Sequence, residues 1–241
     1  MLSLKHRLRL IKIVLLISFI CFIGKIKAVN YTPVFAMTPT ENNYDKIILI
    51  DPGHGGFDGG AVSKNGTKEK DINLNISIKL RDLLQDFGYI VLMTRDKDIG
   101  LYSNKNVSIS QRKYEDLNKR CLLKRDSNCH IFISIHQNYF PQSKYYGAQV
   151  WYSNSEKSEI LGNLIQEKLR MHLDKRNIRQ CKRAVNDYKI LRCHPEIPSV
   201  IIECGFLSNP NEENKLKNET YQHMVAEAIA KAINDYFELE T

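Results

Sequence analysis

Two histidines each follow a hydrophobic run that is typical of a buried strand. Residues 46–50 lead into the turn that carries His54, and residues 130–135 lead directly into His136. A third apolar run ends in Glu203. Because parallel strands end at one edge of a sheet, where ligands bind, we expect these side chains to lie close together. Imidazoles with nearby carboxylates are the ligands of an open catalytic zinc site, so the pattern indicates a metal-dependent hydrolase.

Two carboxylates complete this set. Glu69 begins a predicted helix, where it either binds the metal or complements the helix dipole, and Asp71 is the alternative residue for the dipole. Glu203 is embedded in an apolar run, which predicts a salt bridge or a general base. As a base it would take a proton from zinc-activated water and return it to the leaving nitrogen. No single signal decides the matter, since His54 alone could be an ordinary turn histidine.

Four further residues are candidates for supporting roles. Gln137 and Asn138 follow His136 directly, so either could orient a ligating imidazole, and Asn138 is also a candidate substrate contact. Arg95 and Arg120 are candidate substrate contacts because guanidinium groups pair well with carboxylates. The alternative for both arginines is an ion pair at the surface or at a helix end.

Other chemistries are disfavoured by missing motifs. The chain has no Gly-x-Ser-x-Gly elbow of a serine hydrolase and no His-Glu-x-x-His of a zincin protease. The glycines of residues 53–60 match neither the dinucleotide-binding nor the P-loop spacing. The formal charge of +8 suggests nucleic acid, but residues 1–27 hold six basic and no acidic residues. The remainder carries 29 basic against 27 acidic residues, a net +2, so we expect no nucleic-acid partner.

The first residues predict export. An apolar run of eleven residues, 13–23, follows a basic start and is short for a membrane span, which needs ~20 residues. We therefore expect residues 1–28 to be a signal peptide or a signal-anchor that contacts the membrane. Residues 29–45 are expected to be a linker and residues 46–241 the catalytic domain, located outside the cytoplasm on the side of the cell wall.

The domain should be a single three-layer α/β unit. Strands alternate with helical patterns, which predicts a mostly parallel twisted sheet of about six strands with helices on both faces. The metal site would lie at the carboxyl edge of that sheet. Expected strands are residues 46–51, 89–94, 130–135, 147–152, 188–192 and 199–202, and expected helices are residues 69–87, part of 108–128, 155–173 and 220–237.

The cysteines leave their pairing open. Five lie outside the leader, namely Cys121, Cys129, Cys181, Cys193 and Cys204. An odd number in an exported protein implies at least one free thiol. Cys204 follows a strand and is expected to be buried and inert.

A further signal comes from five short strings of the sequence, residues 50–56, 69–74, 93–95, 134–138 and 202–209. Together they resemble a known family, the zinc-dependent N-acetylmuramoyl-L-alanine amidases of the amidase 3 type. The resemblance spans residues 46–237 and implies that His54, Glu69 and His136 bind zinc and that Glu203 is catalytic. It also implies a reaction, hydrolysis of the amide between N-acetylmuramic acid and L-alanine of the peptidoglycan stem peptide.

Within the family, the chain is most similar to the germination-specific amidases of spore formers. It lacks wall-binding repeats and an added segment that would block the zinc, and Gln137 stands where a small residue is commoner. This resemblance implies action on spore-cortex peptidoglycan, in the pathway to the muramic δ-lactam needed for germination. The alternatives are a vegetative cell-wall autolysin, or a conditionally active wall-binding protein that needs an extracytoplasmic activating partner to retain zinc.

Overall fold

Six strands form one sheet, in which four strands run in one direction and two in the other. The computed structural model describes residues 45–103, 106–185 and 187–239. The strand order is β2-β1-β3-β6-β4-β5; β4 is antiparallel to β6, and every other neighbouring pair is parallel. Since β5 is parallel to β4, both β4 and β5 run opposite to the other four strands. The strands are β1 (Ile47–Pro52), β2 (Ile90–Met93), β3 (Ile131–Asn138), β4 (Gln149–Tyr152), β5 (Lys182–Arg183) and β6 (Ser199–Phe206).

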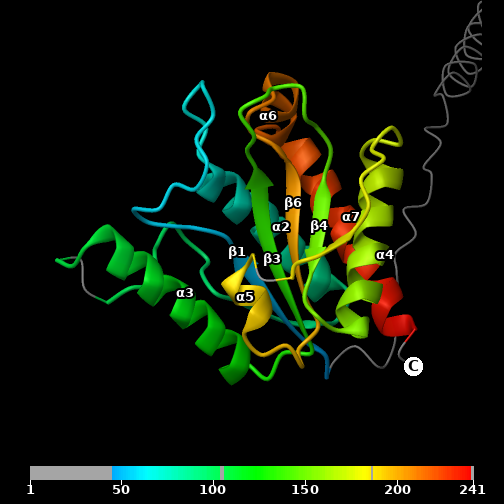
Figure 1. The fold of residues 1–241 in the computed structure, drawn as a ribbon. Helices are drawn as coiled ribbons and strands as arrows, with labels where there is room; N and C mark the ends of the chain where they lie inside the picture. The colour runs from blue at the N-terminus through cyan, green and yellow to red at the C-terminus, as the bar shows by residue number, and fades with distance from the viewer. Residues whose placement is uncertain (1–44, 104–105, 186, 240–241) are drawn as a thin grey trace, which may run out of the picture. The chain divides into compact units, whose positions relative to one another are not determined.

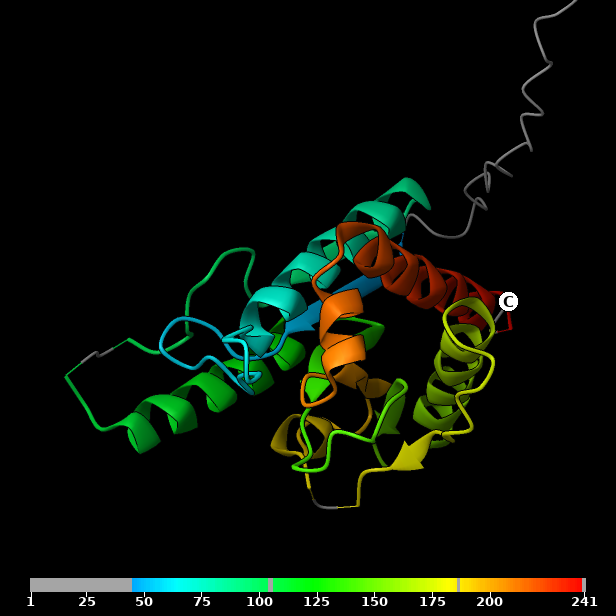
Figure 2. The same cartoon turned by 90° about the horizontal axis from the view of Figure 1, so that it is seen from above.

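Four strands are thus mutually parallel, and helices cover both faces of the sheet. In Figures 1 and 2, α2, α7 and α4 pack side by side on one face, while α3 and the short α5 lie on the other. This confirms the predicted three-layer, mostly parallel α/β architecture. The helices are α2 (Glu69–Asp86), α3 (Ile109–Asp126), α4 (Glu156–His172), α5 (Lys189–Arg192), α6 (Pro210–Leu216) and α7 (Glu219–Glu238).

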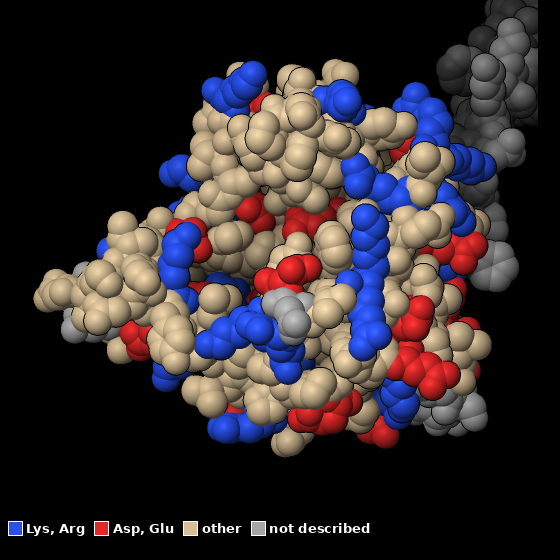
Figure 3. Space-filling view, in the orientation of Figure 1, with Lys and Arg blue, Asp and Glu red and all other residues tan. Residues whose placement is uncertain are grey.

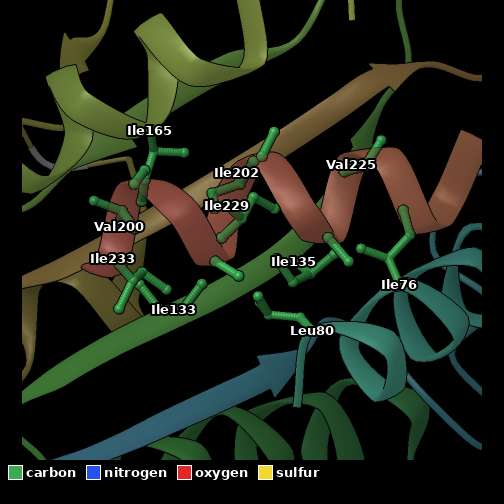
Figure 4. Packing of buried hydrophobic residues seen from close by; sticks show 14 of the residues in the cluster. Ile76, Leu80, Ile133, Ile135, Ile165, Val200, Ile202, Val225, Ile229 and Ile233 are labelled. Atoms are coloured by element: carbon green, nitrogen blue, oxygen red, sulfur yellow. The ribbon is translucent and has the colours of Figure 1, made fainter. Parts of the chain in front are cut away.

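Strand alternation divides the core into two layers. In β1, Ile48 and Ile50 belong to the larger cluster, whereas Leu49 belongs to the smaller one on the opposite face. Figure 4 shows the larger cluster, in which side chains of α2 and α7 meet Ile133 and Ile135 of β3. Because both faces are buried, the central strands are apolar throughout, and their polar residues gather near their carboxyl ends.

One predicted strand is wrong. Residues 188–192 contain the single helical turn α5, and the edge position of the sheet is taken by β5 instead. The neighbours Ile190 and Leu191 are both buried in the smaller cluster, which an alternating strand could not achieve but a helical turn can. Lys124 of α3 donates hydrogen bonds to the carbonyls of Ile190 and Cys193, at 3.2 and 2.7 Å, and so holds the turn.

A disulfide also joins α3 to the end of this turn. It links Cys121 to Cys193, whose Cα atoms lie 6.0 Å apart. Cys129, Cys181 and Cys204 are free, and Cys204 is 1% exposed, as expected. The pairing therefore fixes α5 beside α3 on the face of the sheet that carries the site.

The predicted leader and most of the predicted linker lie outside the described residues. Among the residues that the structure describes, no helix has the length and apolar character needed to cross a membrane.

Candidate metal centre and active site

His54 is held in an unusual backbone conformation beyond the end of β1. Its φ of 62° lies in the left-handed region, which few residues other than glycine adopt and which is frequent at functional sites. The preceding Gly53 passes so close to His136 that a Cβ atom there would overlap its imidazole ring. The glycine is needed for this close approach, which brings the two histidines together with ring centroids 5.0 Å apart.

Glu69 is the first residue of α2, and backbone donors fix both of its oxygens. Oε2 accepts a hydrogen bond from Ala61 N at 2.7 Å, and Oε1 accepts one from Gln137 N at 3.0 Å. The side chain of Asn73, one helical turn later, also donates to Oε1 at 3.3 Å. The carboxylate is therefore held in one orientation before any ligand binds.

Three side chains form a donor set that could hold a metal ion. His54 Nε2 lies 3.3 Å from Glu69 Oε2, and His136 Nδ1 lies 2.9 Å from Glu69 Oε1. The three ligand atoms all lie within 4.8 Å of one another. Two imidazoles and one carboxylate fit a zinc ion that keeps one open coordination position. Sequence reasoning therefore named the three residues that the structure brings together.

Asp58 orients His54 and was not predicted from the sequence. Its Oδ2 lies 2.9 Å from His54 Nδ1, which leaves Nε2 directed toward Glu69. Burial opposes a charged imidazole, but the bonds to Asp58 and Glu69 outweigh it and raise the pKa of His54 to about 9. A carboxylate behind a ligating histidine is typical of metal sites. The only sequence signal was an acidic residue four positions after His54 in the same loop.

Glu203 lies on the strand beside His136, at the same register position. The two side chains therefore project from the same face of the sheet. Glu203 is 8% exposed, and its Oε2 is buried with no hydrogen-bond partner among the described residues. Burial raises the pKa of Glu203 to about 7. The salt bridge considered as an alternative is not found there, and the carboxylate stays available for proton transfer.

Tyr188 is a second residue that the sequence did not single out. Burial and the negative charge of Glu203 raise the pKa of Tyr188 to about 12, so its phenol stays protonated. Its ring packs against Trp151 of β4, with centroids 5.8 Å apart.

Arg120 and Arg95 are engaged inside the fold. Arg120 of α3 pairs with Asp51 and donates to the carbonyl of His54 at 2.7 Å. Arg95 donates to the carbonyls of Pro52 and Gly53, at 2.9 and 3.0 Å. Each side chain is only 2% exposed. Their contact with substrate stays an untested prediction, and this burial argues against it, since both guanidinium groups already hold the loop of His54.

Gln137 and Asn138 have different places at the end of β3. The amide of Gln137 donates to Asn73 Oδ1 at 3.1 Å, and its backbone fixes Glu69. Gln137 thus orients the carboxylate rather than an imidazole. Asn138 lies past a register shift between β3 and β6, partly exposed, and its contact with substrate stays a prediction.

A cavity of about 220 Å³ opens beside the two histidines. It lies between the loop of residues 53–58, helix α3 and α5, and its lining includes His54, His136, Asp58 and Ile190. The two histidines of the donor set therefore face a space that a substrate can enter.

Comparison with known proteins agrees with this geometry. A family model described as N-acetylmuramoyl-L-alanine amidase matches residues 48–235. The germination-specific N-acetylmuramoyl-L-alanine amidase of Bacillus subtilis is 42% identical over 193 residues, which cover 80% of each chain. The solved CwlD amidase of Clostridioides difficile, in complex with the GerS lipoprotein, is 44% identical with a TM-score of 0.79, covering 81% of this chain and 100% of that one.

A third relative matches this chain over only part of its own length. The probable cell wall amidase LytH of Staphylococcus epidermidis is 34% identical over 80% of this chain, and the match covers 58% of the length of LytH.

The fold and site define a class, an α/β protein with a candidate metal centre at the carboxyl edge of its sheet. Within that class, the chain belongs to the N-acetylmuramoyl-L-alanine amidase family.

Proposed function

We propose that this protein hydrolyses the amide between N-acetylmuramic acid and L-alanine of the peptidoglycan stem peptide. Zinc would be held by His54, Glu69 and His136, and Glu203 would be the catalytic base. The observation that carries this proposal is the juxtaposition of the donor set with a buried carboxylate that has an unpartnered oxygen.

Different residues of the site would have different roles in the proposed hydrolysis. A zinc ion, when bound, polarises a carbonyl group and makes water a stronger acid. Glu203 would accept the proton of the attacking water and deliver it to the nitrogen of L-alanine, so that the amide bond breaks and a neutral amine leaves. Asp58 would keep Nε2 of His54 directed at the metal, and Gln137 and Asn73 would keep Glu69 in place.

Mass analysis of products from purified muropeptides tests this reaction. Zinc-loaded protein should release a free stem peptide that begins with L-alanine, together with the matching glycan that has lost its peptide. Metal analysis should find about one zinc per chain. Cleavage at another bond, or intact muropeptides after incubation with zinc-loaded protein, would reject the assignment.

The substrate in the cell is proposed to be spore-cortex peptidoglycan. The support is the 42% identity to a protein named as germination-specific and the structural match to CwlD. Deleting the gene in the source organism should yield spores whose cortex lacks muramic δ-lactam. A defect confined to growing cells would favour the alternative of a vegetative autolysin, which the likeness to LytH keeps open.

A partner protein is a second part of the proposal. The solved CwlD structure holds a lipoprotein, which favours an activating partner for this chain as well. Such a partner would stabilise the zinc-bound state selectively. Zinc occupancy and turnover should then rise when extract of sporulating cells is added. Equal values with and without extract would exclude an activator.

Residues 1–28 are proposed to direct the protein out of the cytoplasm, and residues 46–241 to form the catalytic domain. The described core and candidate site are built by residues within 46–239. A chain that starts at residue 46 should therefore retain the helical content, unfolding temperature and zinc content of the whole protein. Loss of folding on that truncation would contradict the proposed boundary.

A further inference from the structure

A second cavity lies on the other side of Glu203, at the edge of the sheet. Its volume is about 440 Å³, and it is lined by the loop before β4 and by the segment that leads into β5. Its lining includes Lys144, Arg179 and Lys182 but no acidic residue. None of these three cations forms an ion pair with another residue in the described part of the chain. Figure 3 shows Lys and Arg side chains gathered over this edge.

The cavity faces the same side of the sheet as the candidate active site. Gln149, which lines it, pairs directly with Glu203 across β4 and β6, so the two side chains share one face. In the register of the sheet, Lys182 lies opposite Trp151 of β4, and Trp151 lies opposite Ile201 of β6. Ile201 is two positions before Glu203, so the side chains of all these residues project from the same face. The cavity therefore begins one strand away from Glu203, at Gln149, and extends to the second strand, at Lys182.

Two of the three cationic groups lie against other groups that line this edge of the sheet. Arg179 Nε donates to the carbonyl of Tyr146 at 2.8 Å, and its guanidinium lies 4.6 Å from the centre of the Phe206 ring. The ammonium of Lys182 lies 5.6 Å from the centre of the Trp151 ring. The side-chain amide of Gln149 donates a hydrogen bond to the carbonyl of Gln180. A guanidinium that is already oriented, as that of Arg179 is, binds an anion at a lower cost in conformational entropy.

We propose that this cavity binds a carboxylate of the stem peptide, on the side of the scissile amide that leaves with L-alanine. This inference rests on the proposed function. Neighbouring strands lie about 4.8 Å apart, so Lys182 belongs to a strand about 10 Å from that of Glu203. An extended peptide advances about 3.3 Å per residue, so the acidic residues two or three positions into the stem reach the cavity. The cavity would then favour stem peptides with a free carboxylate and would fix the direction in which the peptide runs away from the scissile amide.

A binding measurement tests the subsite without requiring catalysis. Zinc-loaded protein is titrated by calorimetry with a synthetic stem peptide that carries free carboxylates, and with the same peptide after amidation. The acidic peptide should bind about tenfold more tightly, the size of one charge-assisted hydrogen bond. Lys182→Gln and Arg179→Gln should each remove this preference.

Arg183→Gln is the matched control, because it removes the same charge from the next residue of β5. The side chain of Arg183 projects to the opposite face of the sheet, where it donates a hydrogen bond to the side-chain oxygen of Asn154. The Arg183→Gln variant should therefore keep the preference for the acidic peptide. Equal affinity of the two peptides, no measurable binding, or equal losses in the control and in Lys182→Gln would overturn the subsite. Inorganic phosphate that binds as tightly as the acidic peptide would show a general anion site and reject the stem peptide as its occupant.

A hydrolysis assay distinguishes failure of the subsite from failure of the proposed amidase function. With muropeptide substrates, the same two variants should lower kcat/KM about tenfold for the acidic stem and leave the amidated stem unchanged. If the peptide binds as described but no amide is cleaved, the proposed function fails and the subsite stands. If cleavage occurs without any preference for the acidic stem, the subsite fails and the function stands.

Discussion

At the scale of single residues, the candidate site depends on carboxylates with different surroundings. Glu69 receives two backbone donors and faces both histidines. Burial acts to raise its pKa, but the contacts with His136 and His54 outweigh burial and hold that pKa well below the usual range. Glu203 has no such donors on Oε2, and burial raises its pKa. The environment therefore assigns them different roles, one as a ligand and one as a group that exchanges protons.

Replacement of Glu203 by Gln should abolish most activity without unfolding the protein. The amide has nearly the same shape but cannot accept the proton, so kcat should fall about 10²- to 10⁴-fold. Zinc content and unfolding temperature should stay at the values of the parent protein. A variant with parental kcat on purified muropeptides would show that Glu203 is not the base.

Asp58→Ala should weaken metal binding, because His54 loses the group that orients it. Loss of such a partner lowers metal affinity about 10- to 100-fold. Competition with a chelator measures the change directly. Asp71→Ala is the control, since Asp71 is exposed in the first turn of α2 and lies outside the donor set. Equal zinc affinities of these two variants would contradict the role of Asp58.

At the scale of elements, α6 anchors the loop that precedes Glu69. Glu213 of α6 is 2% exposed and accepts hydrogen bonds from Ser63, Thr67 and Asn65, at 2.8, 2.6 and 2.8 Å. These donors lie about 150 positions earlier in the chain, on the segment between the loop of His54 and α2. The helix after β6 thereby positions the start of α2.

Glu213→Gln should destabilise the protein by about 1.5–3 kcal/mol near neutral pH, because hydrogen bonds to a charged acceptor are replaced by weaker ones. Burial acts to raise the pKa of Glu213, but the bonds from Thr67, Ser63 and Asn65 outweigh it and lower that pKa. The stabilisation is therefore present above pH 4.5, the ordinary value, and is lost as pH falls below it.

Thermal unfolding at several pH values checks this prediction. The gap in unfolding temperature between the parent and Glu213→Gln should shrink as pH drops below 4.5. Glu219→Gln, at an exposed position in the first turn of α7, serves as the control and should stay close to the parent. A gap that does not change with pH would argue against a charged Glu213.

At the scale of the whole molecule, one disulfide ties two distant parts of the chain on the face that carries the site. Cys121 and Cys193 are 72 positions apart, and the enclosed segment includes β3, β4, α4 and β5. The link holds α5, which lines the cavity through Ile190, against α3, which carries Arg120. Both walls of the cavity beside the histidines are thereby joined.

Removal of this disulfide should lower stability strongly. Closing a loop of this length contributes about 4 kcal/mol in the chain-entropy description. The double variant Cys121→Ala with Cys193→Ala should unfold at a lower temperature, and a reducing agent should not lower it further. Cys181→Ala, which removes a free thiol, should respond to the reducing agent as the parent does. Equal stability of parent and double variant would show that the link adds nothing.

The local pattern of the sequence was enough for the layered fold and for the candidate donor set. Runs of apolar residues predicted the strands, and the polar residues that end them, His54, His136 and Glu203, had to meet because parallel strands end at one edge. Glu69 was predicted as the start of α2, where the structure places it. These features follow from periodicity over a few residues, which can be read directly from the chain.

Contacts between distant residues were decided only by the tertiary structure. Asp58 could not be recognised until the loop folded back on His54, and Arg120 is used internally because α3 passes beside a loop 66 positions away. The turn α5 replaced a predicted strand because α3 and a disulfide hold it. The cavity at the sheet edge likewise depends on which strands become neighbours. Sequence patterns record which residues are buried, whereas packing selects the partners that they meet.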